Sequence, residues 1–89
     1  MICKIADLRN KQVVSVETGT VLGFINDLEI NTVTGEISNV IIYGKAKFMG
    51  FLGRDEDIAI SWNSIEVIGE ETILVKGPIQ FASNNRKIL

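Results

Sequence analysis

The chain has 89 residues, of which 46% are hydrophobic and 22% are charged, a composition that is typical of one globular domain and excludes a disordered chain. With nine basic residues against eleven acidic ones, the chain lacks the excess of basic residues expected of generic nucleic-acid binding. The longest strongly apolar run, 40–43, is far shorter than a membrane span of about 20 residues. The single cysteine, Cys3, excludes an intramolecular disulfide, and residues 1–10 lack the apolar core of a signal peptide, so we expect a cytoplasmic protein.

The first predicted elements are short. Residues 2–9 fit either a strand or one helical turn, with Ile5 and Leu8 facing the core in both cases. Residues 12–16 are rich in β-branched side chains and predict the first strand. A turn follows, in which Gly19 supplies the positive φ that a tight turn needs.

A longer strand is predicted over residues 21–30, but its two-residue period breaks in the middle. Gly23 and the polar pair Asn26 and Asp27 shift the apolar positions from one face to the other. We therefore expect a bulge or a sharp bend at residues 26 and 27. Asp27 is interpreted as a structural carboxylate that caps backbone amides, as turn aspartates routinely do, rather than as a catalytic acid.

The second half of the chain predicts a hairpin and three further short strands. Residues 31–35 have the length and glycine placement of a hairpin loop, and the return strand covers residues 36–43. Alternating apolar residues over 58–62 indicate a half-buried strand. Two more short strands are predicted over 65–68 and 72–75.

The folded domain is expected to end at Gly77 and Pro78, because proline cannot extend a β-ladder. The sequence thus predicts an all-β fold, a small antiparallel β-barrel of about six short strands formed by residues 1–77. Closure of the barrel would remove exposed strand edges. Residues 78–89 are expected to form a C-terminal tail, whose order the sequence leaves open.

An ordered set of short motifs runs through the chain: Asp7-Leu8 with Lys11 and Val14; Gly19-x-x-Leu22-Gly23-x-Ile25-x-Asp27-Leu28-x-Ile30; Thr34-Gly35-x-Ile37; Phe48-x-Gly50-Phe51-x-Gly53-Arg54; and Ile58-x-Ile60-x-Trp62-x-x-Ile65-x-x-Ile68-Gly69. Over about residues 4–76 this set resembles the PRC-barrel family, and within it the small stand-alone proteins of the YlmC/YmxH sporulation type found in spore-forming bacteria. Ser61 departs from the pattern, since the family often has proline before the tryptophan.

The resemblance implies a PRC-type barrel that serves as a binding or assembly module. Relatives occur as the cytoplasmic part of a photosynthetic reaction-centre subunit and as one domain of a ribosome-maturation factor, so the resemblance implies no catalysis. For the small sporulation type it implies a link to spore formation. The core and turn positions that we expect to be structural are Gly19, Gly23, Asp27, Gly35, Ile60, Trp62, Ile65 and Gly69.

The residue inventory excludes most catalytic chemistry. The chain has no histidine and one cysteine, so a zinc site and a nucleophilic triad both lack their groups. No phosphate-binding loop is present, and we predict no enzyme, no cofactor, no metal and no small-molecule substrate. The acidic cluster 55–57 is interpreted as a charged loop end rather than a calcium site, because calcium loops space their ligands along the turn. Cys3 is interpreted as a small buried hydrophobe or a bystander.

The segment 44–54, termed the basic loop, is the main candidate for function. It holds apolar side chains without a strand period, together with three basic residues and no acid, whereas residues 55–71 hold six acids and no base. Either Phe48 and Phe51 plug one mouth of the barrel, or part of the loop stays exposed as an apolar patch with a basic rim, which is typical of a protein interface. A membrane-surface role is a third interpretation. The candidate partner-binding residues are Lys45, Lys47, Phe48, Met49, Phe51, Leu52 and Arg54.

We predict that the basic loop binds a partner protein or a second copy of the chain. A homodimer suits a domain with a thin core, and the acidic stretch 55–71 facing the loop of another copy would make it salt-sensitive. The alternative is an RNA or ribonucleoprotein accessory factor, with basic residues on phosphates and Phe48 or Phe51 stacked on bases. The basic residues concerned are Lys45, Lys47, Arg54, Arg86 and Lys87.

Overall fold

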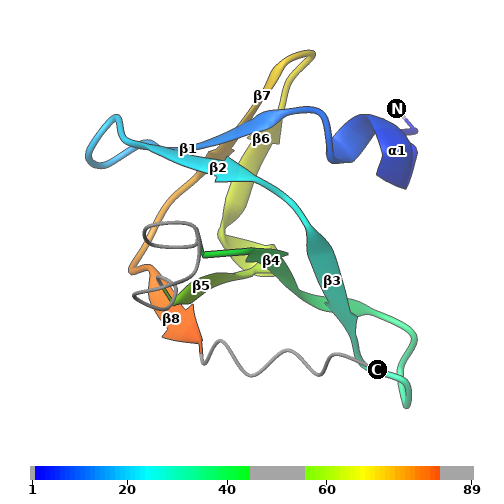
Figure 1. Cartoon of the computed structure of the whole chain (residues 1–89). Coiled ribbons are helices and arrows are strands. Elements are labelled where there is room, and N and C mark those ends of the chain that lie inside the picture. Colours follow the sequence, from blue (N-terminus) through cyan, green and yellow to red (C-terminus); the bar gives the residue numbers. More distant parts are fainter. Residues whose placement is uncertain (1, 45–55, 83–89) are drawn as a thin grey trace, which may run out of the picture.

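The structure, a computed structural model, describes residues 2–44 and 56–82 (Figure 1). In chain order its elements are α1 (Ile5–Leu8), β1 (Gln12–Ser15), β2 (Val21–Phe24), β3 (Asp27–Ile30), β4 (Ile37–Ile42), β5 (Asp57–Ser61), the 3-10 helix η2 (Trp62–Ser64), β6 (Ile65–Ile68), β7 (Thr72–Val75) and β8 (Gln80–Ala82). The predicted all-β class is confirmed. No helix among the described residues is long and apolar enough to cross a membrane.

The strands form two four-stranded sheets, with the orders β2-β1-β7-β6 and β3-β4-β5-β8. Neighbouring strands are antiparallel except β1 and β7, which pair in parallel. Two details of the sequence prediction were therefore wrong: the described residues contain eight strands rather than about six, and the sheets do not close into one barrel. β2, β6, β3 and β8 remain edge strands.

The N-terminal segment adopts the helical alternative. The backbone amides of Asp7 and Leu8 both donate to the carbonyl of Lys4, and this closes a single turn. Leu8 is buried in the core, but Ile5 is 58% exposed. The expectation that both face the core thus holds for Leu8 alone.

The predicted bend in the second strand is real, and it separates two strands that belong to different sheets. Ile25 is buried between them, and the amide of Asn26 donates to the carbonyl of Ile41 at 2.8 Å. Gly23 has φ +130°, and a Cβ there would lie 3.0 Å from Cγ2 of Ile42. The glycine therefore lets β2 pass close over β4, so that chain 21–30 leads from one sheet to the other.

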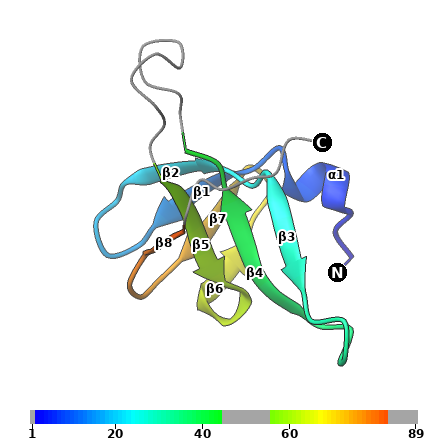
Figure 2. The same cartoon turned by 60° about the horizontal axis from the view of Figure 1, so that its bottom comes forward.

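The chain continues the second sheet beyond the expected domain end at residue 77. Gly77 has φ +87°, which turns the backbone after β7. Pro78 then lies in the connection, where no ladder hydrogen bond is required of it, and β8 pairs antiparallel with β5. Figure 2 shows β8 at the side of the second sheet away from β3.

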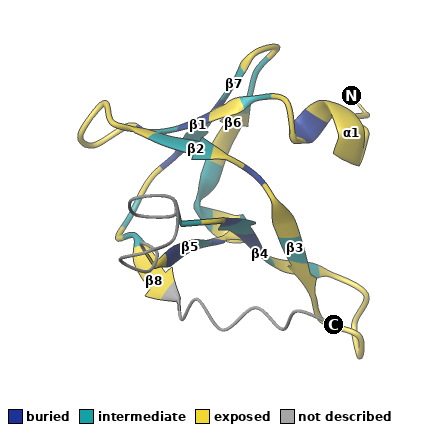
Figure 3. Ribbon diagram, viewed as in Figure 1, coloured by how far each residue is buried: buried dark blue, intermediate teal, exposed yellow. Residues whose placement is uncertain are grey.

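The core lies between the two sheets and draws mainly on the central strands of each, β1, β7, β4 and β5 (Figure 3). Its buried apolar residues are Leu8, Val13, Ile25, Val40, Ile42, Ile60, Ile73 and Val75. Half-buried side chains extend it, among them Trp62 and Ile65. The edge strands contribute little, so apolar side chains on β2, β3 and β8 stay partly exposed.

Candidate functional site

The basic loop leaves and re-enters the second sheet between two adjacent strands. β4 ends at Ile42 and β5 begins at Asp57, and Ile42 pairs with Ile58. Of the predicted loop only Gly44 lies among the described residues. The candidate partner-binding residues Lys45, Lys47, Phe48, Met49, Phe51, Leu52 and Arg54 all lie outside them. The described part of the site is therefore the base of the loop.

Asp57 ties the two stems of the loop together. Its Oδ1 accepts a hydrogen bond from the backbone amide of Gly44 at 2.7 Å, and the residue is only 3% exposed. A buried carboxylate on a backbone amide makes a charge-assisted bond, about twice as strong as a neutral one. Asp57, expected as part of a charged loop end, is thus a buried structural group.

A second set of bonds fixes the same end of the sheet. Oδ1 of Asn26 accepts from the amide of Tyr43 at 2.7 Å, next to the amide that Asp57 holds. Asp27 Oδ1 accepts from the amide of Leu28 at 2.8 Å, the kind of cap expected of it. Desolvation by burial, and then the charge of Asp27 and a hydrogen bond to it, raise the pKa of Tyr43 above its ordinary value of 10.0.

An apolar hollow of about 340 Å³ lies beside the loop base. Two of its walls are exposed aromatics: Phe81 of β8 is 66% exposed and Tyr43 is 37% exposed. The hollow is lined by Leu22, Ile42, Tyr43, Gly44, Glu56, Ile58 and Phe81. The sequence analysis missed Phe81 because it assigned residues 78–89 to a tail, although Ile79 and Phe81 on either side of Gln80 show the alternation of a short strand.

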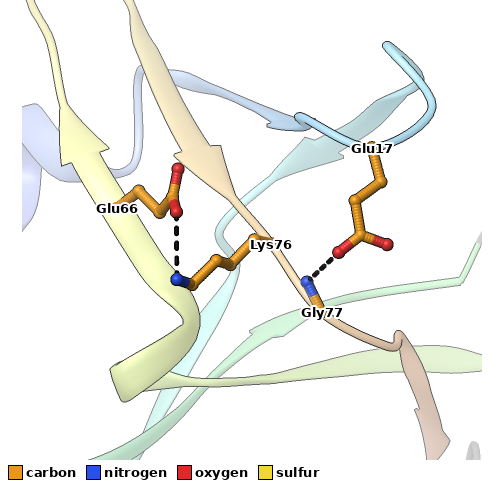
Figure 4. A network of polar contacts seen from close by, with 4 residues as sticks. All are labelled: Glu17, Glu66, Lys76 and Gly77. Atoms are coloured by element: carbon orange, nitrogen blue, oxygen red, sulfur yellow. Dashed lines mark hydrogen bonds and ion pairs between the residues drawn. The ribbon is translucent and has the colours of Figure 1, made fainter.

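The turn that carries β8 to this hollow is held by a side chain from the turn between β1 and β2, two strands of the other sheet. Oε1 of Glu17 accepts from the amide of Gly77 at 2.8 Å (Figure 4). Beside it, Lys76 pairs with Glu66 at 3.2 Å. That ion pair is largely exposed and contributes little, whereas the Glu17 bond fixes where the chain crosses between the sheets.

The motifs of the chain match a known family. A family model described as the PRC-barrel domain matches residues 3–80. The chain belongs to the PRC-barrel family.

Three PRC-barrel relatives are of nearly the same length as this chain. It is 43% identical over 72 residues to the probable sporulation protein YlmC of Bacillus subtilis (strain 168), covering 81% of this chain and 89% of YlmC. It is 35% identical over 78 residues to an uncharacterized protein of Clostridium acetobutylicum, covering 88% of each. It is 30% identical over 77 residues to the uncharacterized protein YmxH of Bacillus subtilis (strain 168), covering 84% of this chain and 89% of YmxH.

The remaining structural positions predicted for the PRC-barrel are spread through the fold. Gly19 and Gly35 have φ of +70° and +78°, so both occupy turns that favour glycine. Gly69 has its amide bonded to the carbonyl of Thr72 at 2.8 Å, which closes the turn between β6 and β7. Oγ of Ser61 accepts from the amide of Asn63 and starts η2, so serine supports the turn where the family often has proline.

The described residues contain no group of three or more histidine, cysteine or carboxylate side chains placed to hold a metal ion. Cys3 is exposed, so of its two predicted interpretations the buried hydrophobe was wrong. The polar groups at the loop base bond backbone amides, which is a structural task. What the arrangement offers a ligand is an apolar hollow beside a fixed loop stem.

Proposed function

We propose that this PRC-barrel protein is a non-catalytic binding and assembly module of the cytoplasm. It binds a partner protein, or a second copy of itself, through the basic loop 44–54. Its relation to the probable sporulation protein YlmC supports a role linked to sporulation.

The observation that carries the proposal is the construction of the loop base. The amides of Tyr43 and Gly44, consecutive at the exit from β4, each donate to a side chain, Asn26 and Asp57 respectively. A loop that starts from a fixed stem loses less conformational freedom on binding, which favours affinity. The hollow with Phe81 and Tyr43 adds apolar surface on the described fold, next to the base of the loop.

The RNA alternative ranks second because of the charge around the loop base. The charged groups described there are the carboxylates of Asp27, Glu56 and Asp57. One basic group, Arg9, is close enough for its charge to act on Tyr43, so acidic groups predominate. Acidic groups repel phosphates, whereas they suit a protein partner that complements both the basic loop and its acidic stem.

A pull-down of the tagged chain from sporulating Bacillus subtilis cells, with and without ribonuclease, tests the proposal. The variant Phe48→Asp/Phe51→Asp is compared with the matched control Val33→Asp, which also replaces an exposed apolar residue, at the β3–β4 hairpin and 93% exposed. We expect a protein partner that survives ribonuclease, is lost with the double variant and is kept by the control. Loss on ribonuclease treatment supports the RNA alternative instead.

Self-association is tested separately by sedimentation of the purified chain over a range of salt concentrations. A dimer that weakens with salt and with Phe48→Asp/Phe51→Asp supports contact between the basic loop and the acidic stretch 55–71. A monomer under all conditions removes self-association from the proposal and leaves the partner protein.

A further inference from the structure

A second apolar groove lies on the opposite side of the sheet from β8. It has a volume of about 290 Å³ and lies between α1 and β3. Figure 2 shows α1 beside β3 at that edge of the sheet. The lining residues are Ile5, Leu8, Arg9, Ile25, Asn26, Asp27, Leu28 and Ile30. The groove shares Asn26 and Asp27 with the loop base. None of its lining residues belongs to the basic loop or to the hollow beside Phe81, and the proposed function makes no use of it.

The groove leaves apolar side chains incompletely covered. Ile5 on α1 is 58% exposed and Ile30 on β3 is 55% exposed, on either side of it. Among the described strands β3 pairs only with β4, so no neighbouring strand covers its outer edge. The volume is about twice that of an apolar cavity of about 150 Å³ that holds benzene, so two aliphatic side chains would fit.

The chain itself contains a segment of matching chemistry. Seven residues, 83–89, follow Ala82 in the sequence, and they end in the basic pair Arg86-Lys87 and the apolar pair Ile88-Leu89. The groove has apolar walls, and its lining includes Arg9 and the Asp27 carboxylate. Glu29, which accepts a hydrogen bond from Asn39, follows on β3, so acidic groups outnumber basic ones there by two to one. Basic residues next to an apolar pair therefore complement acidic groups next to an apolar groove.

The segment is long enough to reach the groove. The register Asp27–Ile41–Ala59–Gln80 places Ala82 at the end of the sheet at which the chain enters β3. Three strand spacings separate β8 from β3, about 14 Å. Seven residues span up to about 23 Å when extended.

We propose that residues 86–89 dock in cis into the groove between α1 and β3, with Ile88 and Leu89 against Ile5 and Ile30, and with Arg86 and Lys87 beside Asp27 and Glu29. The segment then covers the open edge of the second sheet. This proposal does not depend on the basic loop.

A nitroxide attached to Cys3, the only cysteine, tests the contact, because Cys3 is exposed and two residues from Ile5. We expect the methyl resonances of Ile88 and Leu89 to lose most of their intensity in the labelled full chain. The variant Ile30→Asp should restore them, whereas Val33→Asp, an exposed apolar residue away from the groove, should not. Equal broadening in the two variants overturns the proposal.

Two further measurements keep the outcome decisive. If Ile30→Asp does not fold, Ile88→Asp/Leu89→Asp replaces it, and the amide resonances of Ile5 and Leu28 must then shift relative to the wild type. A mixture of isotope-labelled chain without nitroxide and unlabelled chain with nitroxide distinguishes docking within one chain from docking between two chains. Broadening in that mixture shows that a second copy supplies the segment, and overturns docking in cis.

Discussion

Replacing Asp57 by alanine tests whether the loop stem is held as the structure indicates. The change removes a charge-assisted hydrogen bond to the amide of Gly44 at a site that is 3% exposed. Hydrogen bonds to charged groups contribute about 1.5–3 kcal/mol, and relief of carboxylate desolvation offsets part of this, so we expect a loss of about 2 kcal/mol in the free energy of unfolding. For a domain of this size that lowers Tm by about 8–16 °C.

The assay is urea unfolding followed by the fluorescence of Trp62, the only tryptophan, which packs against the core directly after β5. Asp57→Asn keeps an acceptor oxygen without the charge, so it should lose about half as much. Glu56→Ala, at an exposed neighbouring position, is the control and should change stability by no more than about 0.5 kcal/mol. An Asp57→Ala variant as stable as this control, with the Gly44 amide still protected from hydrogen exchange, would refute the reasoning.

Three other predictions concern the fold around the site. Gly23→Ala should cost about 2–3 kcal/mol in urea unfolding, because φ is +130° and the new Cβ meets Ile42 at 3.0 Å, and an unchanged midpoint would contradict this contact. Tyr43, the only tyrosine, should titrate by absorbance above pH 10.0, and Asp27→Asn should lower its midpoint. Because the folded pKa is raised, this contribution to stability is complete below pH 10 and is lost as the pH rises through the folded pKa. Glu17→Ala should speed hydrogen exchange in β8 more than in β6; equal effects would show that the bond to the β7–β8 turn is not what fixes β8.

The local alternation of apolar and polar residues was sufficient to predict most strands, for a physical reason. The half-buried strand predicted over 58–62 is β5 in the structure, and its bounds agree to within one residue. Successive side chains of a strand point to opposite faces of the sheet, so the alternation reports directly which face is buried. The same holds for β6 and β7. Pairing is different, since β1 joins β7 in parallel across about sixty residues of chain, and a two-residue period carries no information on the partner.

The candidate site was predictable only in part for a related reason. The apolar and basic character of the loop is visible in the sequence, but the burial of Asp57 is not, because a carboxylate beside a charged loop is usually solvated. It becomes buried only when β4 brings the Gly44 amide over it. Likewise Phe81 joins the hollow only because Gly77 and Glu17 redirect the chain to the second sheet.

The backbone amides of Tyr43 and Gly44, which donate to side chains at the end of β4, connect stability to binding. If the fixed stem supports binding, Asn26→Ala should weaken partner recovery although Asn26 lies outside the basic loop, because Tyr43 loses the bond that orients its backbone. A neutral hydrogen bond contributes about 1 kcal/mol, which corresponds to about fivefold in affinity. Titration of the purified partner against wild type, Asn26→Ala and the control Val33→Asp measures this loss of affinity. A partner that binds all three equally would show that it recognises the loop as a flexible apolar segment, and that the stem serves the fold alone.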